Sequence, residues 1–295
     1  MRDRGHSATV ALVARERRHT LRFLDEIRAF SPVFLDTEID MTRVAAHRSA
    51  ARVQGRRYST ITYVLHMAAR VLDRHPAANA AIRGRIRPHV ARYESVSGKI
   101  TADKTLNGHR VVFTTVLRDL QQADLDDIQR QVDHFRDGDA AVMPELAPAR
   151  ALQRLPTPIG RVVFRLGVRP LTRRADVMGT FAVTSLGHRP VDSFFSVGGT
   201  TITLGIGRTA DRPVVREGQV RVRPMMRLSV TFDHRVIDGA EAADIMAEIS
   251  AGLESWPDIP DDPDRDIPAA AQPSVALAGA DRPAGTGLTA PAEEP

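Results

Sequence analysis

The sequence predicts an α+β fold in which helices cover one face of a mixed β-sheet. Apolar residues recur at helical spacing early in the chain and again shortly before its C-terminal tail. Short β-forming runs lie between them, and Thr201–Leu204 alternates with period two. The order is therefore helices followed by mixed strands, and it ends in a strand, a turn and a helix.

Five helices are predicted from apolar stripes, capping residues and breakers. The first carries Leu21, Leu24 and Ile27, and it ends at Ser31-Pro32 because the residue before a proline avoids the helical region. The third starts at Ser59 or Thr60 and buries a stripe that includes Ile61, Val64, Leu65, Ala68, Val71 and Leu72. The predicted ranges are Ala14–Phe30, Thr42–Val53, Ser59 or Thr60 to the residue before Pro76, Asp124–Phe135 and Gly239–Trp256.

Strands are predicted where β-branched and aromatic residues cluster between turn signals. The predicted ranges are Val33–Asp40, Arg110–Leu117, Thr180–Ser185, Thr201–Gly207, Gln219–Arg223 and Met226–Asp233.

Composition divides the 295-residue chain into a flexible N-terminus (1–13), one domain (14–256) and a disordered tail (257–295) rich in proline, alanine and acidic residues. The tail holds eight acidic and two basic residues, so it contributes −6 to the net charge of +5 and leaves +11 for the rest. A basic body attracts anionic partners. Without a recognition motif and with few aromatic residues, nucleic acid is not expected.

The absence of cysteine excludes disulfides, thiolate metal sites and a cysteine nucleophile. The charged N-terminus does not resemble a signal peptide, and no run of 18 apolar residues occurs. We therefore expect a cytoplasmic protein.

The run from Phe232 to Gly239 carries the most specific chemistry of the chain. His234 and Asp238 lie on the connection between the last strand and the last helix, where side chains can face a cleft. Histidine suits a general base because its ordinary pKa, about 6.5, lies near the working pH. The alternative is a capped turn with solvated charges, whereas a metal site is not expected because further ligands are lacking nearby.

The run Ser229–Ala240 resembles the active-site signature of the dihydrolipoyl acyltransferase catalytic domain of 2-oxo acid dehydrogenase complexes, a relative of chloramphenicol acetyltransferase. Further resemblances follow in that family's order and extend over roughly Ala14 to Glu254. They are Asp40-Met41-Thr42, His75-Pro76-Ala77-Ala78-Asn79-Ala80, Ala102-Asp103-Lys104, Thr115-Val116-Leu117-Arg118-Asp119 and Gly179–Gly187.

The resemblance implies a mechanism and three site residues. His234 would deprotonate the thiol of coenzyme A, a pantetheine arm or dihydrolipoamide. Thr184, which stands where the family usually has serine, would hydrogen-bond the oxyanion, and we prefer it to the adjacent Ser185 because strand alternation points Ser185 to the other face. Asp238 would be mainly structural and would pair with Arg17 or Arg18.

The resemblance also implies a homotrimer with the histidine and the hydroxyl on different chains. The substrate would be a coenzyme A or pantetheine thioester, with no metal and with no lipoyl group on this chain, since Lys104 matches the catalytic domain rather than a lipoylation site. Because an acidic tail stands where the relatives have an apolar cage-forming segment, we expect free trimers rather than a cage.

Residues 138–178 depart from the family as an insertion with a basic amphipathic segment at 158–174. This segment is either an ordinary helix with its apolar face in the core or in the trimer interface, or a surface element. A surface element could contact a membrane, a long acyl chain or an acyl carrier protein.

Three functional hypotheses remain open. The first is an acyltransferase that uses an acyl thioester, with His234 as its base. The second is a carrier-protein-dependent acyltransferase or condensing enzyme of specialised metabolism, and the third is a non-catalytic scaffold subunit. The glycines at 198–199 and 205–207 match no phosphate-binding loop and are expected in turns or strands.

Overall fold

A computed structural model describes residues 11–84 and 86–257. Most of the flexible N-terminus predicted at 1–13, and all but the first residue of the tail predicted at 257–295, lie outside these residues. The helical elements are η1 (Arg15–Arg17), α1 (Arg18–Ile27), α2 (Thr42–Val53), α3 (Thr60–Arg74), α4 (Leu125–Asp137), η2 (Pro144–Leu146), α5 (Ala147–Arg154), α6 (Thr157–Val168), α7 (Leu171–Met178) and α8 (Gly239–Glu254). The strands are β1 (Pro32–Asp40), β2 (Ala80–Arg83), β3 (His89–Arg92), β4 (Gly98–Leu106), β5 (His109–Leu117), β6 (Phe181–Ser185), β7 (Ile202–Arg216) and β8 (Gln219–Asp233).

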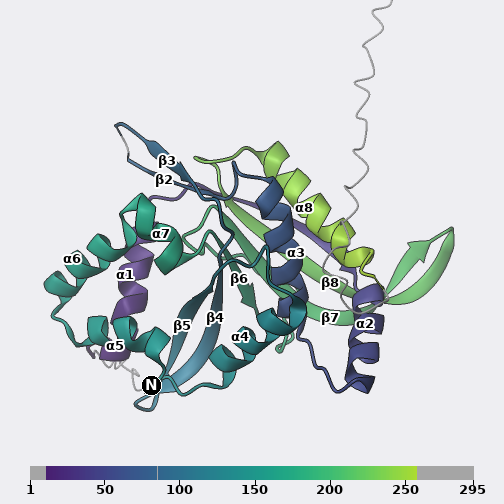
Figure 1. Cartoon of the computed structure of the whole chain (residues 1–295), viewed down its shortest axis with the longest axis horizontal. Coiled ribbons are helices and arrows are strands. Elements are labelled where there is room, and N and C mark those ends of the chain that lie inside the picture. The colour runs from purple at the N-terminus through teal and green to yellow at the C-terminus, as the bar shows by residue number, and fades with distance from the viewer. Residues whose placement is uncertain (1–10, 85, 258–295) are drawn as a thin grey trace, which may run out of the picture.

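The main sheet has six strands in the order β1-β8-β7-β6-β4-β5, and β2 and β3 form a separate hairpin. Strand β6 pairs in parallel with β4 and β7, whereas the other neighbours are antiparallel. Helices α3 and α8 lie side by side against this sheet (Figure 1). The mixed sheet with helices confirms the predicted α+β class.

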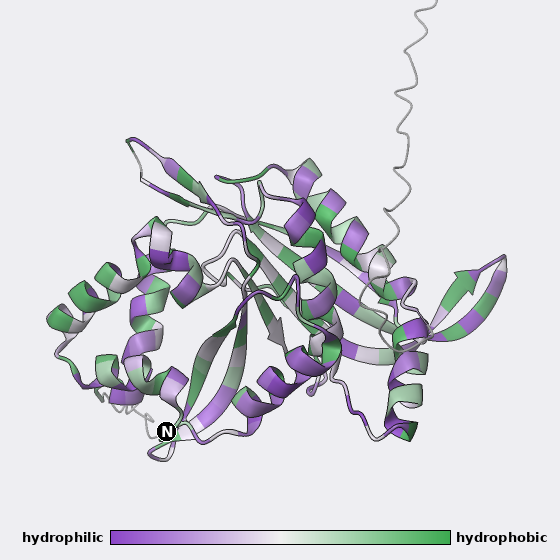
Figure 2. Ribbon diagram, in the orientation of Figure 1, coloured by the Kyte–Doolittle hydropathy of each residue, from purple (hydrophilic) through white to green (hydrophobic). Residues whose placement is uncertain are grey.

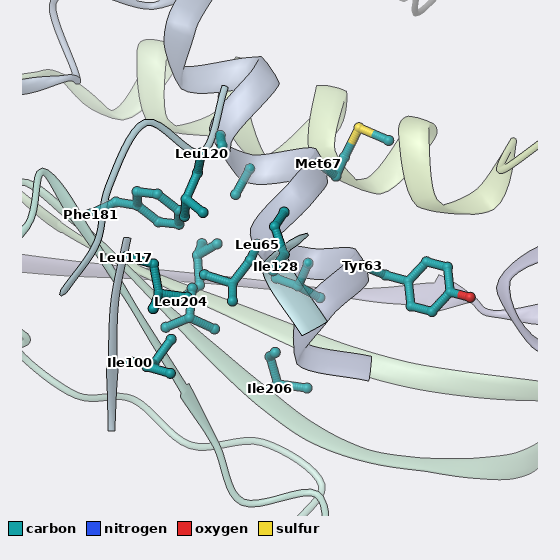
Figure 3. Packing of buried hydrophobic residues seen from close by; sticks show 14 of the residues in the cluster. Tyr63, Leu65, Met67, Ile100, Leu117, Leu120, Ile128, Phe181, Leu204 and Ile206 are labelled. Carbon is teal, nitrogen blue, oxygen red and sulfur yellow. The ribbon is translucent and has the colours of Figure 1, made fainter. Parts of the chain in front are cut away.

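The hydrophobic core fills the space between the sheet and these helices. Strand register places Ile100, Val183, Leu204 and Val230 in one row, and all four belong to the core cluster. Leu65 of α3 lies among Leu204, Leu117 and Ile100 in Figure 3. Since successive side chains of a strand point to opposite faces, the residues that follow this row lie on the other face.

The other face of the sheet is polar where it is central. Thr101, Thr184, Thr203 and Ser229 alternate with the core residues along β4, β6, β7 and β8. Helix α1 lies on this side, because its Phe23 ring is 5.0 Å from the Lys99 ammonium nitrogen of β4. The polar face therefore carries the hydroxyl groups that the sequence singles out, and it is only partly covered within one chain.

The last two strands correct the sequence prediction. Strand β7 continues to Arg216, and β8 is one strand through Pro224 rather than two. Their outer halves form a hairpin that projects from the body (Figure 1). The Pro224 carbonyl accepts a hydrogen bond from the Met41 backbone N–H at 2.8 Å. Pro224 therefore still pairs with its neighbouring segment through its carbonyl oxygen, although it has no N–H to donate.

The insertion forms the helices α5, α6 and α7, which pack near α1 on the side away from α8 (Figure 1). The segment expected at 158–174 forms α6, which ends at Val168, and the first half of α7, which begins after Pro170. Of the alternatives for this segment, an apolar face packed in the core of the same chain is not observed, because Ile159, Val162, Val163 and Leu166 are exposed. No helix in the described residues is both long and apolar enough to cross a membrane.

Candidate active site

A short loop between β8 and α8 holds His234. It begins after Asp233, which is only 2% exposed, and it ends where α8 starts at Gly239. The Asp233 carboxylate accepts two hydrogen bonds from the Arg235 guanidinium, at 2.9 and 2.6 Å, and one from the Ser31 backbone N–H at 3.3 Å. The His234 backbone N–H donates to the Ser31 carbonyl at 2.9 Å. These contacts fix the loop to the start of β1.

The His234 ring is oriented by its own loop. Its Nδ1 lies 3.2 Å from the Ile237 carbonyl oxygen and 3.4 Å from Asp238 Oδ1, and the ring meets Phe232 edge-on at 5.7 Å between centroids. A carbonyl oxygen can only accept, so this contact assigns the proton to Nδ1. Nε2 then carries the lone pair, and the half-exposed side chain can present it to a substrate thiol.

Asp238 lies beside His234, as the sequence suggests, but among the described residues it does not form the expected ion pair with Arg17 or Arg18. Its side chain is 88% exposed and occupies the N-cap position of α8 without a capping hydrogen bond. Within the described part of one chain, its ion-pair partner is His234, and neither Arg17 nor Arg18 pairs with it. The buried acid of the loop is Asp233 instead.

Asp233 was missed by the sequence analysis, although a signal was present. Ser229, Thr231 and Asp233 alternate with the core residues of β8, and Asp233 is the last of the three before the turn. A carboxylate at the end of a buried strand must be paired, and Arg235 is the nearest cation in the chain. The guanidinium of Arg235 also lies 5.1 Å from the Phe30 ring.

Thr184 and Ser185 occupy different faces of β6. The Thr101 hydroxyl donates to Thr184 Oγ1 at 3.2 Å, so the proton of Thr184 is available for an acceptor on the polar face. The Ser185 hydroxyl accepts from the Gly187 backbone N–H at 3.4 Å, which ties it to the turn after the strand. Both hydroxyls therefore accept a hydrogen bond and keep a proton to donate, and strand alternation places Thr184 on the polar face of the sheet with Thr101.

His234 and Thr184 are far apart within one chain. Thr184 lies opposite Gly205 on β7, and Gly205 lies opposite Ser229 on β8. His234 follows Ser229 by five residues. With about 3.4 Å per residue along a strand and about 4.8 Å between strands, the two backbones are about 19 Å apart. One acyl group cannot contact both side chains of the same chain.

Lys99 is a further buried group on the polar face. It lies two residues before Thr101 on β4, and its ammonium donates to the Gly198 carbonyl. Burial, and then the neighbouring Arg174, lower the pKa of Lys99 to about 7. The glycines next to this contact lie in a turn, as expected from the sequence. Gly199 has a φ of +78°, a backbone conformation that favours glycine.

The described residues contain no group of three or more metal-ligating side chains that could hold a metal ion. His66 is buried on α3, and burial, followed by Arg70 and His47, lowers its pKa to about 3. It is a core histidine.

The His234 loop lies in a part of the chain that matches a known family. Residues 171–259 match the family model described as 2-oxoacid dehydrogenases acyltransferase (catalytic domain). The resemblance found in the sequence is confirmed over these residues.

Curated relatives agree with this assignment. An 83-residue segment is 42% identical to the dihydrolipoyllysine-residue succinyltransferase component of the mitochondrial 2-oxoglutarate dehydrogenase complex of Bos taurus, and it covers 26% of this chain and 17% of that protein. Over 221 residues the chain is 25% identical to the acetyltransferase component of the Bacillus subtilis pyruvate dehydrogenase complex, with 74% of this chain and 43% of that protein covered. The chain thus spans less than half the length of these relatives.

Solved structures share the fold. The dihydrolipoamide acetyltransferase of Azotobacter vinelandii superposes with a TM-score of 0.64 at 19% identity, covering 85% of this chain and 93% of that one. A probable dihydrolipoamide acetyltransferase from Listeria monocytogenes gives a TM-score of 0.62 at 16% identity, with 84% and 95% covered. These structures establish that the architecture is that of such catalytic cores.

Proposed function

We propose that the protein transfers an acyl group between a thioester and a thiol or other acceptor, with His234 as the general base. The observation that carries the proposal is the contact between His234 Nδ1 and the Ile237 carbonyl, because it leaves Nε2 as a fixed proton acceptor. In the Azotobacter vinelandii enzyme, a serine, a histidine and an asparagine four residues after it are the residues whose catalytic role was investigated. His234 and Asp238 have the same spacing.

The proposed reaction uses His234 as the base and Thr184 as the oxyanion donor. His234 Nε2 takes the proton of the attacking thiol, and the thiolate adds to the thioester carbonyl. The Thr184 hydroxyl donates to the oxyanion that forms. Collapse of this intermediate breaks the original carbon–sulfur bond, and the departing thiolate takes the proton from His234. Coenzyme A, a pantetheine arm and dihydrolipoamide are the thiols we propose.

The active site is proposed to form between subunits of a homotrimer. The separation of about 19 Å between the two backbones requires Thr184 from one chain and His234 from the next. The polar face of the sheet, which one chain covers only partly, would then be the contact surface. We propose a cytosolic location for this assembly.

A panel of acyl thioesters tests the proposal. The purified protein is incubated with acyl-CoA and acyl carrier protein thioesters as donors and with dihydrolipoamide, amine and alcohol acceptors, and products are identified by mass spectrometry. We expect an acylated acceptor with the native protein and none with His234→Ala at equal concentration. A product only from an acyl carrier protein thioester would favour the carrier-dependent alternative. No product from any donor would refute acyl transfer.

A further inference from the structure

Helix α6 presents its apolar side to solvent. Ile159, Val162, Val163 and Leu166 follow the helical spacing i, i+3, i+4 and i+7, and they are 52%, 57%, 45% and 70% exposed. A surface helix of a globular protein normally turns this stripe toward the core. The buried residues of α6 are Gly160, which has no side chain, and Val168 at the end of the helix. Helix α6 lies at the outer edge of the molecule in Figure 1, and Figure 2 shows it largely in the hydrophobic colour.

The polar groups of α6 hold it in this orientation. Arg161 pairs with Asp25 of α1 at 2.9 Å, and Arg169 just beyond the helix pairs with Glu26 at 3.3 Å. Gly160 packs on the buried guanidinium of Arg22, and a side chain at this position would overlap it. The ion pairs face α1, so the apolar stripe is fixed on the opposite side.

A basic cleft opens between α1 and α6. It has a volume of about 310 Å³ and is lined by Arg18, Leu21, Arg22, Leu24, Asp25, Arg28, Thr157 and Arg161. Asp25 is the one carboxylate among these residues, and it already pairs with Arg161 and with Arg28 at 3.4 Å. Four guanidinium groups against one carboxylate leave the cleft cationic.

Arg22 gives the cleft an uncompensated buried charge. It is 4% exposed, donates to the Leu152 and Leu155 carbonyls at 2.6 and 3.3 Å, and its Nε has no hydrogen-bond partner. No carboxylate of the described residues pairs with it. Burial, followed by Arg18 and Arg161, lowers the pKa of Arg22. A buried cation without a counter-charge is costly, and an anion in the cleft would relieve this cost.

The size of the apolar stripe argues against a second copy of the chain as its partner. The 12 residues of α6 are about 18 Å long, and at about 10 Å width they offer about 200 Å². A stable protein interface needs about 800 Å² on each side. An acidic carrier protein would use the charge of the cleft but not the apolar stripe, whereas an anionic membrane offers contacts to both.

We propose that the α1–α6 surface docks the protein on an anionic membrane. The apolar stripe of α6 lies at the boundary between lipid headgroups and acyl chains, and a lipid phosphate enters the basic cleft. Three such surfaces on a trimer would add by multivalency, which makes a short stripe sufficient. The inference goes beyond acyl transfer and rests on the proposed function only through the trimer.

Vesicle co-sedimentation tests the membrane surface. The full-length protein is mixed with vesicles of phosphatidylcholine, with or without phosphatidylglycerol. We expect binding to the anionic vesicles, weakened by salt, and at least about tenfold weaker binding for the double variant Val162→Asp, Leu166→Asp. Val53→Asp is the matched control, because Val53 is 89% exposed at the end of α2, away from the stripe. It should bind like the native protein.

Light scattering and thermal unfolding accompany each variant. Equal binding by the double variant and the native protein would overturn the proposal, and so would an absence of binding to anionic vesicles. A double variant that unfolds is replaced by Arg18→Gln, Arg28→Gln, which lies on the cleft and carries the same expectation. Dissociation of the oligomer by Val162→Asp, Leu166→Asp would assign the stripe to a subunit interface. Capture of an acyl carrier protein without vesicle binding would assign it to that partner.

Discussion

Two inactive variants should restore activity to each other if the active site spans two chains. His234→Ala keeps Thr184, and Thr184→Val keeps His234. Alone, each homo-oligomer should lose activity, by about 10²–10⁴-fold for the base and about 10²–10³-fold for the oxyanion donor. The separation of about 19 Å within a chain means that a working site needs one intact residue from each neighbour.

The expected recovery can be worked out from the ring. In a randomly mixed closed ring, each site joins one chain's histidine to the next chain's hydroxyl. In a trimer that contains both variants, both are intact at about one site in three. Coexpressed variants with two different tags, purified on both, should therefore regain a substantial fraction of the native acyl-transfer rate. Neither parent should exceed its residual rate.

A control distinguishes real complementation from contamination. Coexpression of His234→Ala with the double variant His234→Ala, Thr184→Val supplies no intact histidine and should stay inactive. Ser185→Ala should keep the native rate, because its hydroxyl is tied to the turn after β6. No recovery in the mixed ring, with both parents folded and assembled, would refute the proposed division of the site.

Two further predictions concern the frame around the site. Asp233→Ala should lower the free energy of unfolding by about 3 kcal/mol, because it leaves Arg235 without its buried partner; urea unfolding that shows less than about 1 kcal/mol would contradict this. The His75 ring is hydrogen-bonded to Glu241 at 2.8 Å and to Glu248 at 3.0 Å. Burial disfavours the protonated imidazole, but the two carboxylates outweigh it and raise the pKa of His75 above its ordinary value. The protonated clamp therefore stabilises the fold below about pH 6.5 and its contribution is lost as pH rises through the raised pKa. The Tm advantage of the native protein over His75→Gln should shrink between acidic and alkaline buffer, and a constant difference would contradict the clamp.

The regular elements near the core could be predicted because their patterns are local. The helix at Thr42–Val53 and the strand at Pro32–Asp40 follow the predicted ranges almost residue by residue. The break predicted between Gln219–Arg223 and Met226–Asp233 is wrong, because β8 continues through Pro224. Strands β2, β3 and β4 were not predicted, because Lys99, Thr101 and Asp103 interrupt the apolar pattern of β4 with polar residues that face the other side of the sheet.

The active site could be predicted in part. His234 and Asp238 come from one contiguous motif, so their proximity follows from the sequence. The distance between His234 and Thr184 follows only from strand order and register, which join residues far apart in the chain. The sequence left the direction of the α6 stripe open, because its spacing is identical for a buried and an exposed helix face.

The rate of thiol acylation by His234→Ala tests the central claim most directly. The native protein and the variant are compared with the acyl thioester and acceptor that the panel identifies, under conditions in which both are folded and assembled. If His234 Nε2 is the general base, kcat/KM should fall at least about 100-fold while the acyl thioester still binds with similar affinity. A rate within a few-fold of the native value would contradict the account, because the oriented imidazole would then play no part in proton transfer.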